Sequence, residues 1–135
     1  MRVEQFAFPG PLRDQLVGAV LSGAKTSTTG LLVEYETEGA PLPVSGTRGA
    51  VVDSAGLIVA VTETTDVRVV PLGEVDLRHA LDEGEGYATV AEWRAGHERF
   101  WQSAELRAAL CDPGFTVDDS TPVVLERFRL VADLR

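Results

Sequence analysis

The first half of the chain begins with apolar residues at helical spacing. Four apolar side chains recur three or four residues apart: Leu12, Leu16, Ala19 and Val20. Pro11 suits the first turn of a helix, and Gly23 suits the position just after the last turn. The pattern therefore predicts a helix over residues 11–22.

The following residues are β-branched and aliphatic, which favours strands. Residues 26–35 predict a strand in which Gly30 is a candidate bulge. Residues 38–49 are rich in turn formers, and a tight turn at residues 54–56 predicts a hairpin. Its second strand continues, with a bend, to Leu72.

Short helices and an acidic loop follow. A helix is expected over residues 75–81, and residues 82–86 form an acidic loop punctuated by glycines. Thr89 and Glu92 have the spacing of a capping box, which predicts that a helix begins there. A further helical turn is expected over residues 103–110.

The order of the elements favours an α+β fold. Residues 121–134 predict a closing strand or a bent pair of strands. Because strands and helices do not alternate regularly, a mixed β-barrel with helices packed at its ends fits better than a parallel sheet. A chain of 135 residues is near the common domain size, so we expect a single domain over residues 1–135.

The composition is that of a globular protein, with 44% hydrophobic and 24% charged residues. No apolar run approaches the roughly 20 residues that cross a bilayer, and the first residues lack an export signal, so a cytoplasmic protein without membrane partners is expected. The single cysteine, Cys111, cannot form an internal disulfide. Two histidines make no ligand cluster, so neither a metal nor a cofactor is expected.

The net charge of −9 narrows the expected partners. Duplex nucleic acid is held mainly by Lys and Arg at phosphates, so extended duplex DNA is not expected, and a small ligand, a single base or a protein partner is favoured. Eleven of the twelve basic residues are arginine, and Lys25 is the one lysine. Genome composition explains the shortage of lysine, but a position that needs an amine able to lose its proton cannot use arginine.

The corner after the first predicted helix carries candidate chemistry, because Lys25 lies beside several hydroxyls. In an extended segment Thr26 and Thr28 share one face and Ser27 takes the other, which lets Lys25 and Thr28 share a ligand. A desolvated lysine can accept the proton of a threonine nucleophile. Gly23, Thr26 and Ser27 are the expected substrate-binding neighbours. The alternative is a surface lysine beside threonines that serve strand propensity.

The acidic loop is a second candidate. Its glycines let backbone and ligand approach Glu83 closely, and a partly buried glutamate can act as general acid or base. Glu85 is expected to contact the substrate. The alternative is a solvated loop that caps a helix, and His79 is interpreted as a packing or capping residue.

An aromatic stripe is the third candidate. Trp93, His97 and Trp101 are spaced by four residues and therefore share one side of a helix. We expect most of this stripe to be core, with Trp93 as the candidate for stacking on a base.

Together these segments resemble the ASCH family, which is related in fold to the PUA RNA-binding domains. The family's G-x-K-x-x-T motif is found as Gly23, Lys25 and Thr28, and HALDEGEG, WRAGHERFW and APLPVSG resemble its later blocks and its proline-bearing loop. The resemblance covers roughly residues 6–131. It implies a single ASCH domain, a PUA-like mixed β-barrel with flanking helices.

Small bacterial ASCH proteins are amidohydrolases that remove the acetyl group from N4-acetylcytidine by means of a Lys, a Thr and a Glu. The resemblance implies that Lys25, Thr28 and Glu83 are this catalytic set, with a nucleoside as substrate. On chemical grounds Thr28 is the expected nucleophile, Lys25 its base and Glu83 the proton donor or positioner, and these roles are exchangeable. The EGEG loop and the aromatic helix depart from those shorter enzymes. A longer family member is associated with ribonuclease activity, so cleavage of single-stranded RNA is the first alternative. A non-catalytic module that binds RNA or a nucleotide is the second, and oligomeric state is not indicated.

Overall fold

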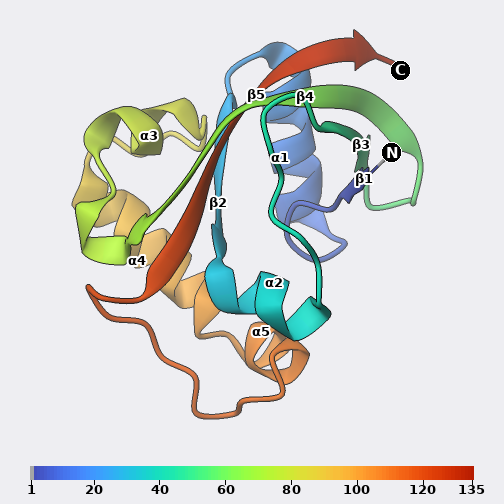
Figure 1. Cartoon of the computed structure of the whole chain (residues 1–135). Helices are drawn as coiled ribbons and strands as arrows, with labels where there is room; N and C mark the ends of the chain where they lie inside the picture. The colour runs from blue at the N-terminus through green and yellow to red at the C-terminus, as the bar shows by residue number, and fades with distance from the viewer. Residues whose placement is uncertain (1) are drawn as a thin grey trace.

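The computed structural model describes residues 2–135 (Figure 1). Its elements in chain order are β1 (Arg2–Glu4), α1 (Pro11–Ser22), β2 (Ser27–Leu31), α2 (Leu32–Glu38), β3 (Arg48–Val52), β4 (Ile58–Pro71), η1 (Leu72–Glu74), α3 (Leu77–Asp82), α4 (Val90–Trp101), α5 (Ala104–Ala109) and β5 (Pro122–Asp133).

The five strands form one sheet in the order β1-β3-β4-β5-β2. β1 lies parallel to β3, and the other neighbouring strands are antiparallel. The long strands β4 and β5 pair over most of their length, and two register shifts in this ladder accompany the bend of β4 seen in Figure 1. The predicted α+β class, the hairpin of β3 and β4, and the bent second strand are confirmed.

The predicted mixed architecture of a curved sheet with flanking helices is confirmed, and within residues 2–135 the sheet stays open. β1 and β2 are its two edges, and they do not pair with each other within residues 2–135. β1 is only three residues long and therefore offers few backbone groups for a further ladder. Residues of both edge strands line one cavity, which lies where a barrel would have closed.

α1 has its predicted bounds. Gly23 ends the helix in the left-handed region with φ 84°, and its N–H donates to a carbonyl of the last turn. The buried face differs from the prediction, because Leu12 is 44% exposed whereas Arg13 is buried. The Arg13 guanidinium donates to two carbonyls of the segment before the helix, which satisfies its charge inside the protein.

Helix α2 was missed, because residues 26–35 were predicted to be one strand. The strand ends at Leu31, and the Glu34 carboxylate accepts the Leu31 N–H at 3.2 Å, which caps the first turn of α2. Gly30 is not a bulge, since it pairs in regular register with Val124. Its missing side chain leaves room for the ring of Tyr35, 3.3 Å from the position of a Cβ atom.

Side-chain caps begin the later helices, and the cap predicted for α4 is confirmed. α3 begins two residues after its predicted start, where Asp76 accepts a backbone N–H at 2.9 Å. Thr89 accepts the N–H of Glu92 at 3.1 Å, so α4 begins at the predicted cap. The carboxylate of Glu92 caps Ala88 and not Thr89, which completes the first turn in a different way.

The core consists of two clusters. One joins the helices α3, α4 and α5 to β2 and β5, and it contains the fully buried Trp93 and Trp101. The other packs α1 against β3, β4 and β5. Within the described residues, no helix has the length and apolar character needed to cross a membrane.

Candidate functional site

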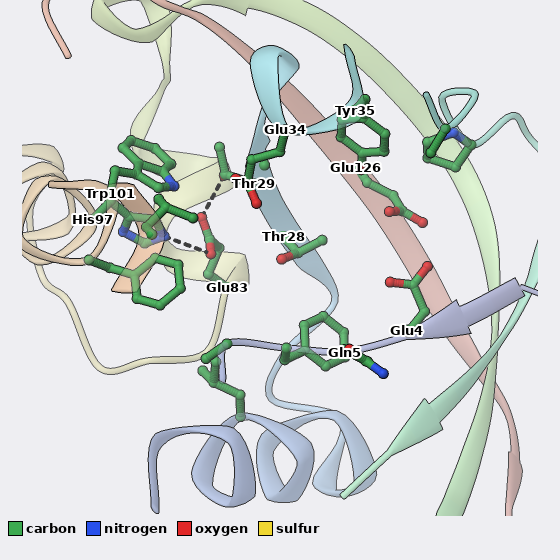
Figure 2. A pocket seen from close by; sticks show the side chains of 18 of the residues that line it. Glu4, Gln5, Thr28, Thr29, Glu34, Tyr35, Glu83, His97, Trp101 and Glu126 are labelled. Atoms are coloured by element: carbon green, nitrogen blue, oxygen red, sulfur yellow. Dashed lines mark hydrogen bonds and ion pairs between the residues drawn. The ribbon is translucent and has the colours of Figure 1, made fainter. Parts of the chain in front are cut away.

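A cavity of about 1030 Å³ lies between the two edge strands. Its volume is at the upper end of the range for small-molecule sites. The predicted catalytic residues Lys25, Thr28 and Glu83 all line it, as does Glu85. Figure 2 shows Glu83, Thr29 and His97 at one end, and Thr28 between this end and a second polar group.

Lys25 and Glu83 form a buried ion pair at the first end. Their exposed fractions are 2% and 1%, and Lys25 Nζ lies 3.4 Å from Glu83 Oε1. The ammonium also donates to the carbonyl oxygen of Ser27 at 2.8 Å. Because burial removes water from both charges, each needs well-placed ion-pair and hydrogen-bond partners. The alternatives of a surface lysine and a solvated acidic loop are therefore wrong.

Hydrogen bonds to both carboxylate oxygens hold Glu83 in place. Oε2 accepts the Trp93 indole N–H at 2.5 Å and the Thr29 hydroxyl at 2.8 Å, and His97 Nε2 lies 3.2 Å from Oε1. Burial raises the pKa of Glu83, but the charge of Lys25 and the hydrogen bonds outweigh it and hold the pKa well below its ordinary value. Glu83 is therefore a carboxylate at neutral pH.

His97 is a functional candidate that the sequence pattern placed in the core stripe. Its ring stacks on Trp93 with centroids 4.3 Å apart, and Nδ1 contacts the Trp93 carbonyl at 2.9 Å. Burial lowers the pKa of His97, but the hydrogen bond to Glu83 and the charges of Glu83 and Glu85 outweigh it and raise the pKa. The helical spacing was visible in the sequence, whereas the acidic partner from the loop was not.

Thr29 was missed because alternation along the strand drew attention to Thr28. Lys25, Ser27 and Thr29 point toward α3: the Ser27 hydroxyl donates to the His79 carbonyl at 3.0 Å, and Thr29 Oγ1 lies 2.7 Å from His79 Nε2. Thr28 lies opposite Glu126 on β5 in the ladder. The structure thus joins Lys25 directly to Glu83 and places Thr28 in the same cavity on the other face of β2.

Of the five predicted substrate-binding residues, the structure places Glu85 on the cavity wall and the other four elsewhere. Glu85 lines the cavity, and its carboxylate lies 3.8 Å from His97 Nε2. Gly23 is an exposed helix cap, Ser27 is fully buried, and Thr26 joins the strand to α3 through its N–H, which donates to the Asp82 carbonyl at 2.8 Å. Trp93 is fully buried and holds Glu83, so it offers no face to a base.

Glu83, Glu85 and His97 also bring one ligand atom each within 4.8 Å of one another, a spacing that suits a metal ion. The Glu83 carboxylate, however, already accepts from Trp93 and Thr29 and pairs with Lys25. The hydrogen bonds and the ion pair account for this cluster without a cation.

Gly84 allows the segments that carry Lys25 and Glu83 to meet. Its φ is +70°, and a Cβ atom placed on it would lie 2.5 Å from the Ala24 carbonyl oxygen and 2.8 Å from the Lys25 nitrogen. Backbone atoms of the acidic loop therefore touch those of the corner after α1. This contact brings Glu83 next to Lys25, 58 residues away in sequence.

We predict that Gly84→Ala lowers the free energy of unfolding by about 3–4 kcal/mol, since it combines left-handed strain with a backbone clash. Gly86→Ala is the matched control, because Gly86 has φ +85° but nothing within 4 Å of its Cβ position. It should lose only about 1–2 kcal/mol. Urea unfolding measures both, and equal losses would contradict the role given to the Ala24 contact.

A second polar group lies at the opposite end of the cavity, where Figure 2 shows Glu4, Glu126 and Tyr35. Glu126 is 4% exposed and accepts the Thr64 hydroxyl at 2.6 Å, and Arg2 Nη2 lies 2.8 Å from Glu4 Oε1. Burial, and then the charge of Glu126, raise the pKa of Glu4 to about 7. We call Glu4 and Glu126 the carboxylate pair; no sequence motif pointed to it.

The raised pKa of Glu4 predicts a pH-dependent stability. Folded Glu4 keeps its proton up to about pH 7, whereas the unfolded residue loses it near 4.5, so stability falls as the pH rises between these values. Glu4→Gln should remove this fall and stabilise the protein at pH 8 by up to about 3 kcal/mol. Urea unfolding from pH 4 to 8 tests this, with the exposed Glu36→Gln as control. If the free energy of unfolding of Glu4→Gln falls with pH as steeply as that of the wild type, the role given to Glu4 is wrong.

A family model of the ASCH domain matches residues 4–132. Among solved structures, the protein EF3133 from Enterococcus faecalis V583 has a TM-score of 0.84 and 27% sequence identity, over 99% of this chain and 77% of that one. An ASCH domain from Lactobacillus crispatus JV V101 has a TM-score of 0.81 and 24% identity, over 96% and 78%. A mutant of the protein ZmASCH from Zymomonas mobilis has a TM-score of 0.54 and 11% identity, over 90% and 70%.

No curated protein matches the chain. The two structures below 25% identity are similar in fold alone, and they agree with the predicted PUA-like α+β architecture. The family model spans almost all of the described residues. The chain therefore belongs to the ASCH domain family.

Proposed function

We propose that this protein hydrolyses an amide on a modified nucleoside, with an N4-acetylcytidine-like compound as substrate. Membership of the ASCH family suggests a function related to RNA, which includes its modified nucleosides. The observation that carries the proposal is the Lys25–Glu83 ion pair, which is almost fully buried at the end of a cavity large enough for a nucleoside. A buried ionisable group with a strongly shifted pKa in a cavity, such as Glu83, is typical of a catalytic site.

The pair supplies both proton transfers that amide hydrolysis needs. When a ligand displaces water from the cavity, the two buried charges become more costly, and a proton moves from Lys25 to Glu83. The neutral amine then accepts the proton of Thr28 while the Thr28 oxygen bonds to the acyl carbon. As the carbon–nitrogen bond breaks, Glu83 gives its proton to the leaving amine, and the ion pair is restored. Water then releases the acyl group from Thr28.

His97 and Thr29 keep Glu83 aligned for this exchange. Both contact its carboxylate, at 3.2 and 2.8 Å, and both line the cavity. A general acid must be held within hydrogen-bond reach of the group it protonates. We therefore assign them to positioning, and Lys25, Thr28 and Glu83 to the chemistry.

The test is incubation of the purified protein with N4-acetylcytidine, with longer N4-acyl cytidines and with single-stranded RNA. Release of cytidine, absent in Lys25→Arg, supports the proposal, since arginine keeps the charge but not an amine that can lose its proton. Added chelator should leave the rate unchanged. Shortened RNA would support a ribonuclease instead, and binding without turnover would support a module that only recognises its ligand.

A further inference from the structure

The carboxylate pair, Glu4 and Glu126, lies in the cavity but has no part in the reaction proposed above. Glu4 comes from the edge strand β1 and Glu126 from β5, and both line the cavity. Gly49 on β3 makes room for Glu4, because a Cβ atom there would lie 2.6 Å from Glu4 Cγ. The two acidic side chains therefore lie close together on the cavity wall.

One carboxylate oxygen of Glu126 has an ion-pair contact with Arg2 but no hydrogen bond. Oε2 accepts the Thr64 hydroxyl at 2.6 Å, whereas the nearest cation to Oε1 within residues 2–135 is Arg2 Nη2 at 3.8 Å, beyond hydrogen-bonding distance. The side chain is 5% exposed and lines the cavity. A carboxylate oxygen on a cavity wall forms strong hydrogen bonds, so a ligand that brings donors would be stabilised here.

The charge of the cavity wall excludes one class of ligand. Six acidic side chains line it, those of Glu4, Glu34, Glu38, Glu83, Glu85 and Glu126. Glu4 adds its negative charge only near and above pH 7. Lys25 is paired with Glu83, and Arg2 is paired with Glu4 through Nη2, whereas Arg2 Nη1 has no hydrogen-bond partner within residues 2–135. The carboxylates would repel a phosphate group, whereas they would accept hydrogen bonds from hydroxyl groups.

Thr28 links the two ends of the cavity. It lies opposite Glu126 in the β2–β5 ladder, and side chains at such positions stand roughly 5 Å apart at Cβ. The neighbouring Thr29 contacts Glu83. A ligand that lies along β2 past Thr28 therefore meets the ion pair with one end and the carboxylate pair with the other.

We propose that Glu4 and Glu126 are specificity-determining residues that bind the sugar hydroxyls of an unphosphorylated nucleoside. The orientation of the ligand rests on the proposed function, since it places the acyl amide at Lys25 and Glu83. The carboxylate of Glu126 accepts from a hydroxyl of the sugar, as acidic residues do in other nucleoside-binding sites. Nucleotides and RNA are poor ligands of this cavity because of their phosphates.

Calorimetric binding separates this inference from the hydrolysis. The probes are cytidine, 2′,3′-dideoxycytidine and cytidine 5′-monophosphate, none of which carries a scissile acyl group. The wild-type protein should bind cytidine at least tenfold more tightly than either of the other two. Glu126→Gln, and independently Glu4→Gln, should lower the affinity for cytidine about tenfold, leave the affinity for dideoxycytidine unchanged and raise the affinity for the monophosphate.

Glu38→Gln is the matched control, because Glu38 lines the same cavity but is exposed on α2. It should leave the preference for cytidine over dideoxycytidine unchanged. Three results would each overturn the inference. The first is an equal loss of affinity for cytidine and dideoxycytidine in Glu126→Gln. The others are a monophosphate bound as tightly as cytidine and no binding of cytidine. If acylcytidine is cleaved while the sugar preference is missing, only this inference fails. If the preference holds without cleavage, only the proposed reaction fails.

Discussion

Lys25→Met is expected to abolish hydrolysis and to lower the free energy of unfolding by about 3–5 kcal/mol. The ammonium contacts both the Glu83 carboxylate and the Ser27 carbonyl, and its loss leaves Glu83 as a buried charge without its cation. Methionine fills a similar space, so a packing defect adds little. Urea unfolding gives the loss of stability, and chromatography of released cytidine gives the loss of activity.

The double variant Lys25→Met, Glu83→Gln separates the two effects. Glutamine removes the unpaired charge and still accepts from Trp93 and Thr29, so most of the lost stability should return. Activity should stay absent, because neither the amine nor the acid remains. If the double variant is as unstable as Lys25→Met, the ion pair is not the source of the loss, and any turnover in it would refute the catalytic assignment.

Thr28→Val should reduce hydrolysis by at least roughly a thousandfold while changing the free energy of unfolding by less than about 0.5 kcal/mol. Thr28 is the proposed nucleophile, and valine keeps its shape and its strand propensity. Thr28 is half-buried in the cavity wall, so the loss of its hydroxyl leaves no buried group unpaired. Single-turnover kinetics measures the chemical step directly.

Thr29→Val is the neighbouring control on the same strand. Its hydroxyl donates to Glu83 at 2.8 Å and lies 2.7 Å from His79 Nε2, so this variant should lose about 1–3 kcal/mol of stability and only about tenfold in rate. The reverse order of rates would contradict the assignment of Thr28. It would make Thr29 the nucleophile, with Glu83, which accepts its hydroxyl, as the base.

The local elements of this fold were predictable because their signals are local. Pro11 and Gly23 bound α1 as the sequence indicates, and Thr89 caps α4. α2 was not predictable in the same way, since Val33 and Tyr35 have strand propensity and the helix depends on a carboxylate cap from Glu34. Short segments with mixed propensity adopt the structure that their tertiary neighbours stabilise.

The candidate site shows the same division. Lys25, Thr28 and Glu83 were predicted from motif spacing, and all three line one cavity. The partners that hold Glu83 were not predictable, because Thr29 and His97 come from different elements. Electrostatic effects on Glu83 arise from groups that are close in space and far apart in sequence, so no pattern along the chain reports them.

By itself, the sequence determined the α+β class, the ends of its main helices, the family and the residues most able to carry chemistry, because helix caps, strand propensities and motif spacings act over a few residues. Only the tertiary structure decided that the sheet stays open between β1 and β2, that Lys25 and Glu83 form a buried ion pair, and that Glu4 and Glu126 face the same cavity. These features depend on contacts such as that of Gly84 with Ala24, which join segments about 60 residues apart through packing that involves the whole chain.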